Sequence, residues 1–149
     1  MAAKIHKDPL RVTEFPRLTH LNHVVTSAQD FRYNCIAWGF EDSNRKWWPD
    51  PMGIAYWPPT APREATLQAF EKVLTDLGFI KCQKRGPEPG VLKLALYANN
   101  GAPTHIARML PSGNWWTSKL GDAEDIKHKL DALEGPQYGN VVGIYGRKI

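Results

Sequence analysis

The second half of the chain is a succession of short apolar segments separated by turn-forming residues. Segments 91–98 (VLKLALYA) and 104–110 (THIARML) flank the turn NNGAP, and PSGN then separates THIARML from WWTSKL at 115–120. Short apolar runs between clusters of Gly, Pro and Asn are typical of strands joined by tight turns. Segment 140–148 (NVVGIYGRK) ends the series, whereas 122–135 (DAEDIKHKLDALEG) reads as a short helical or irregular piece. This half therefore predicts an antiparallel sheet.

The first half has helical character after one short predicted strand within 23–31 (HVVTSAQDF). Helix formation is expected from Asn34, whose side chain can cap free amides, through Phe40. The clearest helix spans 60–79, with Thr60 as its expected cap and Gly78 as its end. Its apolar residues recur at helical spacing and predict a core-facing stripe: Leu67, Phe70, Val73, Leu74 and Leu77.

Helices followed by strands indicate an α+β fold, with N-terminal helices packed on a C-terminal antiparallel sheet. A length of 149 residues suits one compact domain with a real core. Residues 1–19, which are mixed polar with two prolines, are expected to form an arm or irregular lead-in. Residues 20–149 are expected to form the single domain.

The charge of the chain indicates which binding partners to expect, and its hydropathy indicates which cellular compartment to expect. The net charge is +4 and the positive residues are scattered, which does not favour a nucleic-acid-binding protein. No segment approaches the about 18 apolar residues of a membrane span, and the start of the sequence lacks the apolar core of a signal peptide. We therefore expect a cytoplasmic protein, or one exported without a signal peptide. In a reducing cytosol Cys35 and Cys82 are expected to be free thiols, whereas export would allow a disulfide between them.

Cys35 and His105 are the candidate catalytic pair. Cys35 follows the capping Asn34, and a helix start stabilises a thiolate through its free amides and dipole. His105 opens a predicted strand directly after a turn, where a side chain can face a cleft and accept the thiol proton. Spacing alone is equally compatible with Cys35 as a small buried core residue and His105 as a strand-edge histidine that binds a carbonyl.

A third residue is needed to orient the imidazole. If PSGN is a hairpin turn, position 107 opposes 118 and position 109 opposes 116. Ser118 then points to the same face as His105, because side chains alternate along a strand. His128 could instead fold back over the end of the sheet, so both Ser118 and His128 are candidates for this role.

Aromatic residues near the cysteine are candidates for a substrate groove or for covering the core. The candidate substrate-binding residues are Asn34, Trp38, Trp48, Trp57 and Trp116. Asn34 is more simply a helix cap than an oxyanion donor. The sequence has no metal-ligand spacing, and GPEPG lacks the ending of a phosphate-binding loop, so we expect neither a metal nor another cofactor.

The strings VVTSAQDFRYNCIAW and THIARMLPSGNWWTSKLGDAEDIKH, with YGNVV near the end, resemble a family of small, largely uncharacterised bacterial and phage proteins. In the order of its elements the chain also resembles papain-like thiol hydrolases of the NlpC type. That resemblance implies a papain-like fold, a Cys at a helix start, a His at a strand start and a third polar residue on the next strand. Cys35 and His105 match the first two positions, whereas Ser118 stands where His, Asn or Gln is usual.

The sequence thus predicts a cysteine hydrolase or acyltransferase that acts on an amide or peptide bond, with Cys35 as nucleophile and His105 as base. Peptide hydrolysis by a thiol protease, amide hydrolysis, deamidation and acyl transfer share an acyl-enzyme and stay open. The partner is then a peptide or protein substrate. The alternative is a non-catalytic protein-binding module, or a degenerate member of that fold that keeps only an aromatic groove.

Overall fold

The computed structural model describes residues 14–149 except 20, 29, 112–113 and 121–123. Residues 1–13 of the predicted N-terminal arm and residues 112–113 of the PSGN turn therefore lie outside the described residues. The strands are β1 (His23–Val25), β2 (Ile80–Cys82), β3 (Val91–Asn99), β4 (Ala102–Met109), β5 (Trp116–Lys119), β6 (Asp125–His128) and β7 (Asn140–Lys148). The helices are α2 (Cys35–Gly39), α3 (Leu67–Asp76) and the 3₁₀ helix η1 (Leu130–Leu133).

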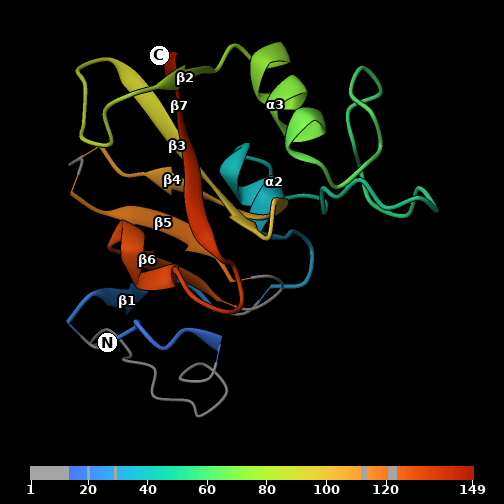
Figure 1. Ribbon diagram of the computed structural model, residues 1–149. Helices are drawn as coiled ribbons and strands as arrows, with labels where there is room; N and C mark the ends of the chain where they lie inside the picture. Colours follow the sequence, from blue (N-terminus) through green and yellow to red (C-terminus); the bar gives the residue numbers. More distant parts are fainter. Residues whose placement is uncertain (1–13, 20, 29, 112–113, 121–123) are drawn as a thin grey trace.

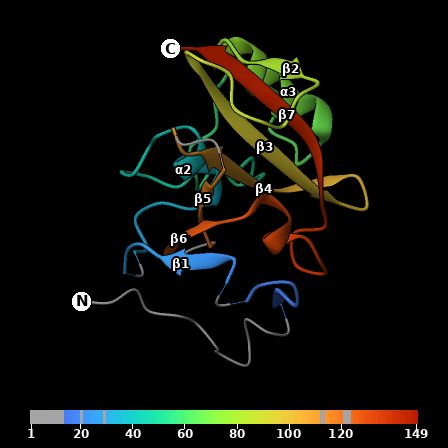
Figure 2. The ribbon, with the colours of Figure 1, turned by 90° about the vertical axis from the view of Figure 1, so that its left-hand side faces the viewer.

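All seven strands belong to one antiparallel sheet in the order β1-β6-β5-β4-β3-β7-β2. Strand β1 lies at one end of the sheet, and β2 with α3 lies at the other (Figures 1 and 2). The last strand, β7, does not lie at an edge, because it pairs with β3 on one side and β2 on the other. Helix α2 packs on the middle of the sheet, against β4 and β5.

The predicted papain-like α+β fold is wrong, because the described chain is largely β with only two short α-helices. Segment 122–135, read as helical or irregular, contains strand β6 followed by η1. Strand β2 was not predicted, and it is short and mostly exposed. In contrast, the strands predicted over 91–98, 104–110, 115–120 and 140–148 are confirmed with small shifts of their ends.

Helix α3 begins later than the sequence predicts. Thr66, not Thr60, is the cap, and its hydroxyl accepts a hydrogen bond from the Ala69 amide at 3.2 Å. The Thr60 hydroxyl instead donates to Asp76 at 2.8 Å, at the far end of the helix. The prolines before Thr66 favour turns over a continuous helix. Gly78 ends the helix as expected, with a left-handed φ of 91°.

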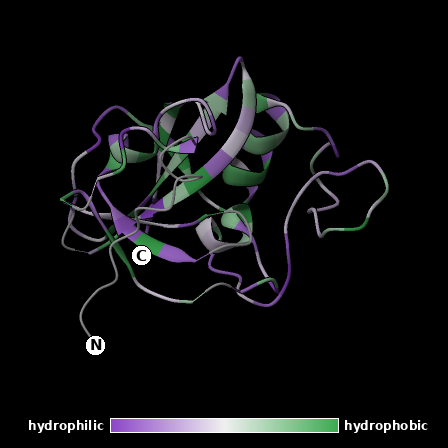
Figure 3. Cartoon of the chain, turned by 90° about the horizontal axis from the view of Figure 1, so that it is seen from below, coloured by the Kyte–Doolittle hydropathy of each residue, from purple (hydrophilic) through white to green (hydrophobic). Residues whose placement is uncertain are grey.

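Each face of the sheet carries its own hydrophobic core. The first core lies on the side of α2 and α3 and includes Ile36, Phe70, Leu94, Leu96 and Ile106. The second includes Tyr97, Ala107, Trp116, Ile126 and Tyr138. Figure 3 shows both hydrophobic and hydrophilic residues along the strands and helices. Among the described residues, no helix is long and apolar enough to cross a membrane.

Candidate active site

Asn34 fixes the start of the cysteine helix and the loop beside it. Its side-chain oxygen accepts from the Ala37 amide at 3.1 Å, which confirms the predicted cap. The same oxygen accepts from the Trp47 amide at 3.0 Å, and the Asn34 Nδ2 donates to the Trp47 carbonyl at 2.8 Å. This Asn34 clamp, made of three hydrogen bonds, holds the residues around Trp47 against the first turn of α2.

Cys35 is the first residue of α2 and is buried, with 6% of its surface exposed. Its Sγ lies 3.8 Å from the carbonyl oxygen of Thr104, the residue before His105. The register shifts at this point of β4: Tyr97 pairs with His105 and Ala98 with Pro103, which leaves Thr104 as the extra residue of a bulge. Bulges redirect side chains and are frequent beside active sites. The thiol is therefore placed against an irregular point of the sheet, next to His105.

His105, Ser118 and His128 form one buried chain of hydrogen bonds across β4, β5 and β6. The Nε2 of His105 lies 2.8 Å from Ser118 Oγ, which lies 2.7 Å from Nε2 of His128. The Nδ1 of His128 in turn lies 2.7 Å from the Lys129 carbonyl oxygen. The register explains this chain, since Met109 pairs with Trp116 as the predicted hairpin requires. Both candidates for the third position, Ser118 and His128, are therefore joined to His105.

The donor and the acceptor of each hydrogen bond in this chain follow from the last acceptor, which is the Lys129 carbonyl. A carbonyl only accepts, so His128 must donate through Nδ1 to the Lys129 oxygen. The neutral His128 ring then accepts at Nε2 from the Ser118 hydroxyl, and the Ser118 oxygen accepts from Nε2–H of His105. This leaves Nδ1 of the neutral His105 ring as an unprotonated lone pair. That nitrogen is buried and has no hydrogen-bond partner among the described residues.

Burial keeps both imidazoles neutral. It lowers the pKa of His128 to about 4, helped by His23 and opposed by the hydrogen bond to the Lys129 carbonyl. The pKa of His105 is also held well below its usual range, first by burial and then by the nearby His128. The neutral His105 ring keeps the lone pair that a general base needs, while its lowered pKa makes it a weaker proton acceptor than an exposed histidine.

Two aromatic rings of the second core pack against the His105 imidazole. The Tyr138 ring stacks on it with centroids 4.0 Å apart and planes inclined by 12°, and the edge of Tyr97 packs at 5.2 Å. Cys35, by contrast, belongs to the first core. The two side chains thus have different packing partners on the two faces of the sheet, and Thr104, whose carbonyl contacts the Cys35 Sγ, lies between them.

The aromatic residues predicted to contact substrate lie in different environments. Trp57 is buried in the first core, where it packs on Phe70, and Trp116 is buried in the second core. Trp48 is half-buried, and its edge packs on Phe70. Trp38 is half-buried as well and is covered on one face by the Arg108 guanidinium, 4.4 Å from the ring centroid. Packing within the fold thus accounts for the contacts of all four rings.

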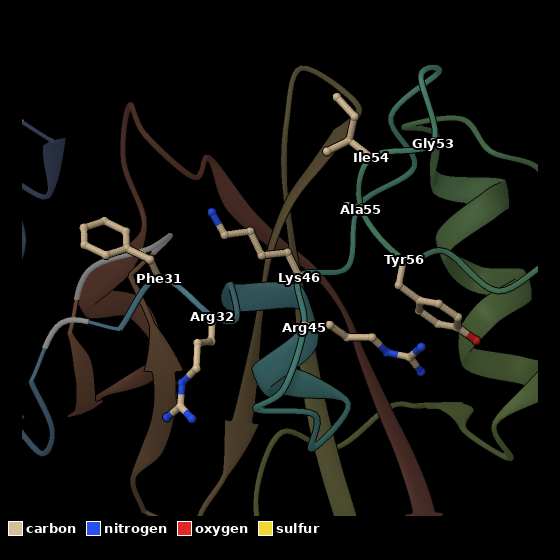
Figure 4. A pocket seen from close by; sticks show the side chains of 8 residues that line it. All are labelled: Phe31, Arg32, Arg45, Lys46, Gly53, Ile54, Ala55 and Tyr56. Atoms are coloured by element: carbon tan, nitrogen blue, oxygen red, sulfur yellow. The ribbon is translucent and has the colours of Figure 1, made fainter.

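A pocket of about 540 Å³ opens beside the start of α2 (Figure 4). Phe31 and Arg32 line it from the segment that leads into α2, and the segment of Arg45 and Lys46 lines it from the loop after that helix. The remaining lining residues are Gly53, Ile54, Ala55 and Tyr56. Sequence reasoning missed this site, although the adjacent Arg45 and Lys46 in an aromatic loop were a signal for it.

Among the described residues, no group of three or more His, Cys, Asp or Glu side chains is arranged to hold a metal ion.

The fold and the site together define a largely β protein with a capped, buried cysteine in the first core and a buried His–Ser–His chain across β4, β5 and β6. Residues 24–146 match a domain-of-unknown-function family, DUF7689, so the chain belongs to that family. The match includes Cys35, His105, Ser118 and His128. None of the curated proteins and none of the solved structures gives a significant match.

Proposed function

We propose that this protein is a cysteine hydrolase or acyltransferase that acts on an amide or peptide bond. Cys35 is the nucleophile and His105 the general base, while Ser118 and His128 position the imidazole. We place the protein in the bacterial cytoplasm or in a phage setting, with a peptide or protein as substrate and export without a signal peptide as the alternative. This setting rests on the sequence motifs.

The observation that carries the proposal is the unpartnered, unprotonated Nδ1 of His105, the residue that follows the Thr104 carbonyl contacted by the Cys35 thiol. The hydrogen-bond chain from Lys129 through His128 and Ser118 fixes the tautomer of His105. The Cys35 Sγ contacts the carbonyl of the preceding residue, Thr104, at 3.8 Å. A third group that fixes the tautomer and orientation of a base is the arrangement that nucleophilic catalysis requires.

The proposed reaction has two halves. The Cys35 thiol transfers its proton to Nδ1 of His105, and Sγ attacks the carbonyl carbon of the substrate to give a tetrahedral intermediate. The C–N bond then breaks, and the leaving amine takes the proton from Nδ1 of His105. The acyl group is now a thioester on Cys35. Water, or an amine in acyl transfer, attacks this thioester while His105 accepts its proton and returns it to the Cys35 sulfur.

The pH dependence of alkylation tests the pairing. Iodoacetamide is expected to modify Cys35 faster than Cys82 well below the ordinary thiol pKa of about 8.5, because His105 removes the proton. The measurement is the rate of labelling of each cysteine-containing peptide by mass spectrometry. His105→Ala should remove the advantage of Cys35, and Ser118→Ala should reduce it, because the imidazole loses its fixed tautomer.

Cys82 serves as the internal control, because it is a free and more exposed thiol. Its labelling should be the same in wild type, His105→Ala and Ser118→Ala. Slow labelling of Cys35 that does not change in His105→Ala would leave Cys35 as a core residue. The protein would then be a non-catalytic module.

A further inference from the structure

We propose that the pocket beside α2 binds an acidic peptide segment, with carboxylates against Arg32 and Arg45 and apolar side chains against Phe31 and Ile54. The pocket holds about 540 Å³ and, among the described residues, is lined by no acidic side chain. Binding does not require the thiol. The further assignment of this peptide as the substrate rests on the proposed function.

Each arginine is oriented by an acidic neighbour and also has N–H groups that this neighbour does not bind. Nε and Nη2 of Arg32 bind Asp30, at 3.1 Å and 2.7 Å, and Nε of Arg45 binds Asp42 at 2.9 Å. Their side chains remain 72% and 54% exposed. Nη1 of Arg32 and both Nη atoms of Arg45 have no hydrogen bond to another described residue. A guanidinium held in this way presents its remaining N–H groups to a carboxylate in a fixed geometry.

The loop wall of the pocket is held in place before any ligand arrives. The Tyr56 amide donates to the Lys46 carbonyl at 2.9 Å, and the Trp48 amide donates to the Tyr56 carbonyl at 3.0 Å. The Arg45 guanidinium lies 3.6 Å from the centroid of the Tyr56 ring. The Asn34 clamp joins this wall to the first turn of α2. A preformed wall lowers the entropy cost of binding.

Phe31 and Ile54 supply the apolar part of the surface. They are 63% and 87% exposed, so both side chains are accessible to a ligand. In Figure 4 they lie on opposite sides of the pocket, with Lys46 between them. This mixture of basic and apolar groups matches a peptide in which acidic and apolar residues alternate.

A nucleic acid fits this surface less well. Proteins that bind single strands offer several open aromatic faces on which successive bases stack. Of the two aromatic side chains that line the pocket, Phe31 is exposed, but the Tyr56 face is covered by Arg45, and Trp47 packs against Tyr56 with centroids 4.7 Å apart. The net charge of +4 is also modest for binding a phosphate backbone.

Fluorescence anisotropy with a rhodamine-labelled peptide of alternating glutamate and leucine tests the proposal. The same peptide with glutamine in place of glutamate, and a labelled oligothymidylate, are the comparison probes. In about 50 mM salt we expect the glutamate peptide to bind about tenfold more tightly than the glutamine peptide. Binding of the glutamate peptide should weaken as salt is added, because the contacts are exposed charge pairs.

Single variants locate the binding site. Arg32→Gln and Arg45→Gln should each weaken binding about two- to fivefold, as expected for exposed ion pairs. Ile54→Ser should weaken it without changing the salt dependence. The matched control is Lys84→Gln, which removes one exposed charge outside the pocket and should leave the affinity unchanged. Thermal melting followed by circular dichroism checks that each variant is folded. Ile54→Ser is the variant that leaves the ion pairs of the loop unchanged.

Three results would overturn the proposal: equal binding of the glutamate and glutamine peptides, tighter binding of the oligothymidylate, or an equal effect of Lys84→Gln. Cys35→Ser should abolish thiol labelling at position 35 and leave peptide affinity unchanged. Failure of the pocket proposal therefore appears in the anisotropy alone, whereas failure of the catalytic proposal appears in the alkylation rates alone.

Discussion

Lowering the pH should destabilise this protein through its buried histidines before most carboxylates titrate. Burial holds the pKa of His128 at about 4, compared with 6.5 in the unfolded chain. Between these two values the unfolded chain binds a proton that the folded protein does not. Neutral His128 therefore contributes its full stabilisation above about pH 6.5, and this contribution falls as the pH drops toward 4.

The size of the effect follows from the pKa difference. The interval from 6.5 to about 4, at about 1.36 kcal/mol for each pH unit, amounts to about 3 kcal/mol. About 2 kcal/mol of this is lost by about pH 5. His105 acts in the same direction, since burial and His128 also lower its pKa. Such a loss is a large share of the usual stability of a small domain.

Urea unfolding at about pH 7.5 and about pH 5, followed by tryptophan fluorescence, measures the loss. His128→Gln removes the titrating ring and should lower the stability at neutral pH. It should also remove about 2 kcal/mol of the difference between the two pH values. Carboxylates contribute equally to both proteins, so the comparison isolates His128. An unchanged pH difference in His128→Gln would show that His128 is not buried in its neutral form, and would refute the proton assignment of the chain.

Three further changes test the packing around the site, each by urea or thermal unfolding. Asn34→Ala removes the helix cap and both bonds to Trp47, so it should cost about 1–2 kcal/mol and loosen the pocket wall. Gly39→Ala would place a Cβ 2.3 Å from the Cγ2 of Ile106, and this overpacking should cost about 1–3 kcal/mol. Lys93→Met should cost about 2 kcal/mol, because the buried ammonium donates to two carbonyls of the β2–β3 loop.

Local signals in the sequence predicted much of the sheet. The long strands β3 and β7 and the register that pairs Met109 with Trp116 follow from alternation and turn residues. Strand β6 could not be identified in this way, because its four residues, Asp125–His128, are mostly charged or polar. Its conformation depends on β5 and on β1, which lies about a hundred residues earlier in the chain. Pairing over such a distance overrides local propensity.

The candidate site likewise contains some features that the sequence predicts and others that it does not. The Asn34 cap and the alignment of Ser118 with His105 depend on neighbouring residues or on one hairpin, and both were predictable. The Thr104 bulge depends on how β3 meets both β4 and β7, so spacing gave no sign of it. The pocket was missed because Arg32 and Arg45 come from two segments that the Asn34 clamp brings together.

The position of β7 also determines when the molecule can fold during synthesis. Strand β2 pairs only with β7, so Ile80–Cys82 has no sheet partner until the ribosome has released residues 140–148. Strand β3, made about fifty residues earlier, likewise keeps one side of its backbone unpaired until that moment. Until β7 has been made, the unpaired edge of β3 can therefore pair with a wrong strand. Pairing with β7 removes this possibility.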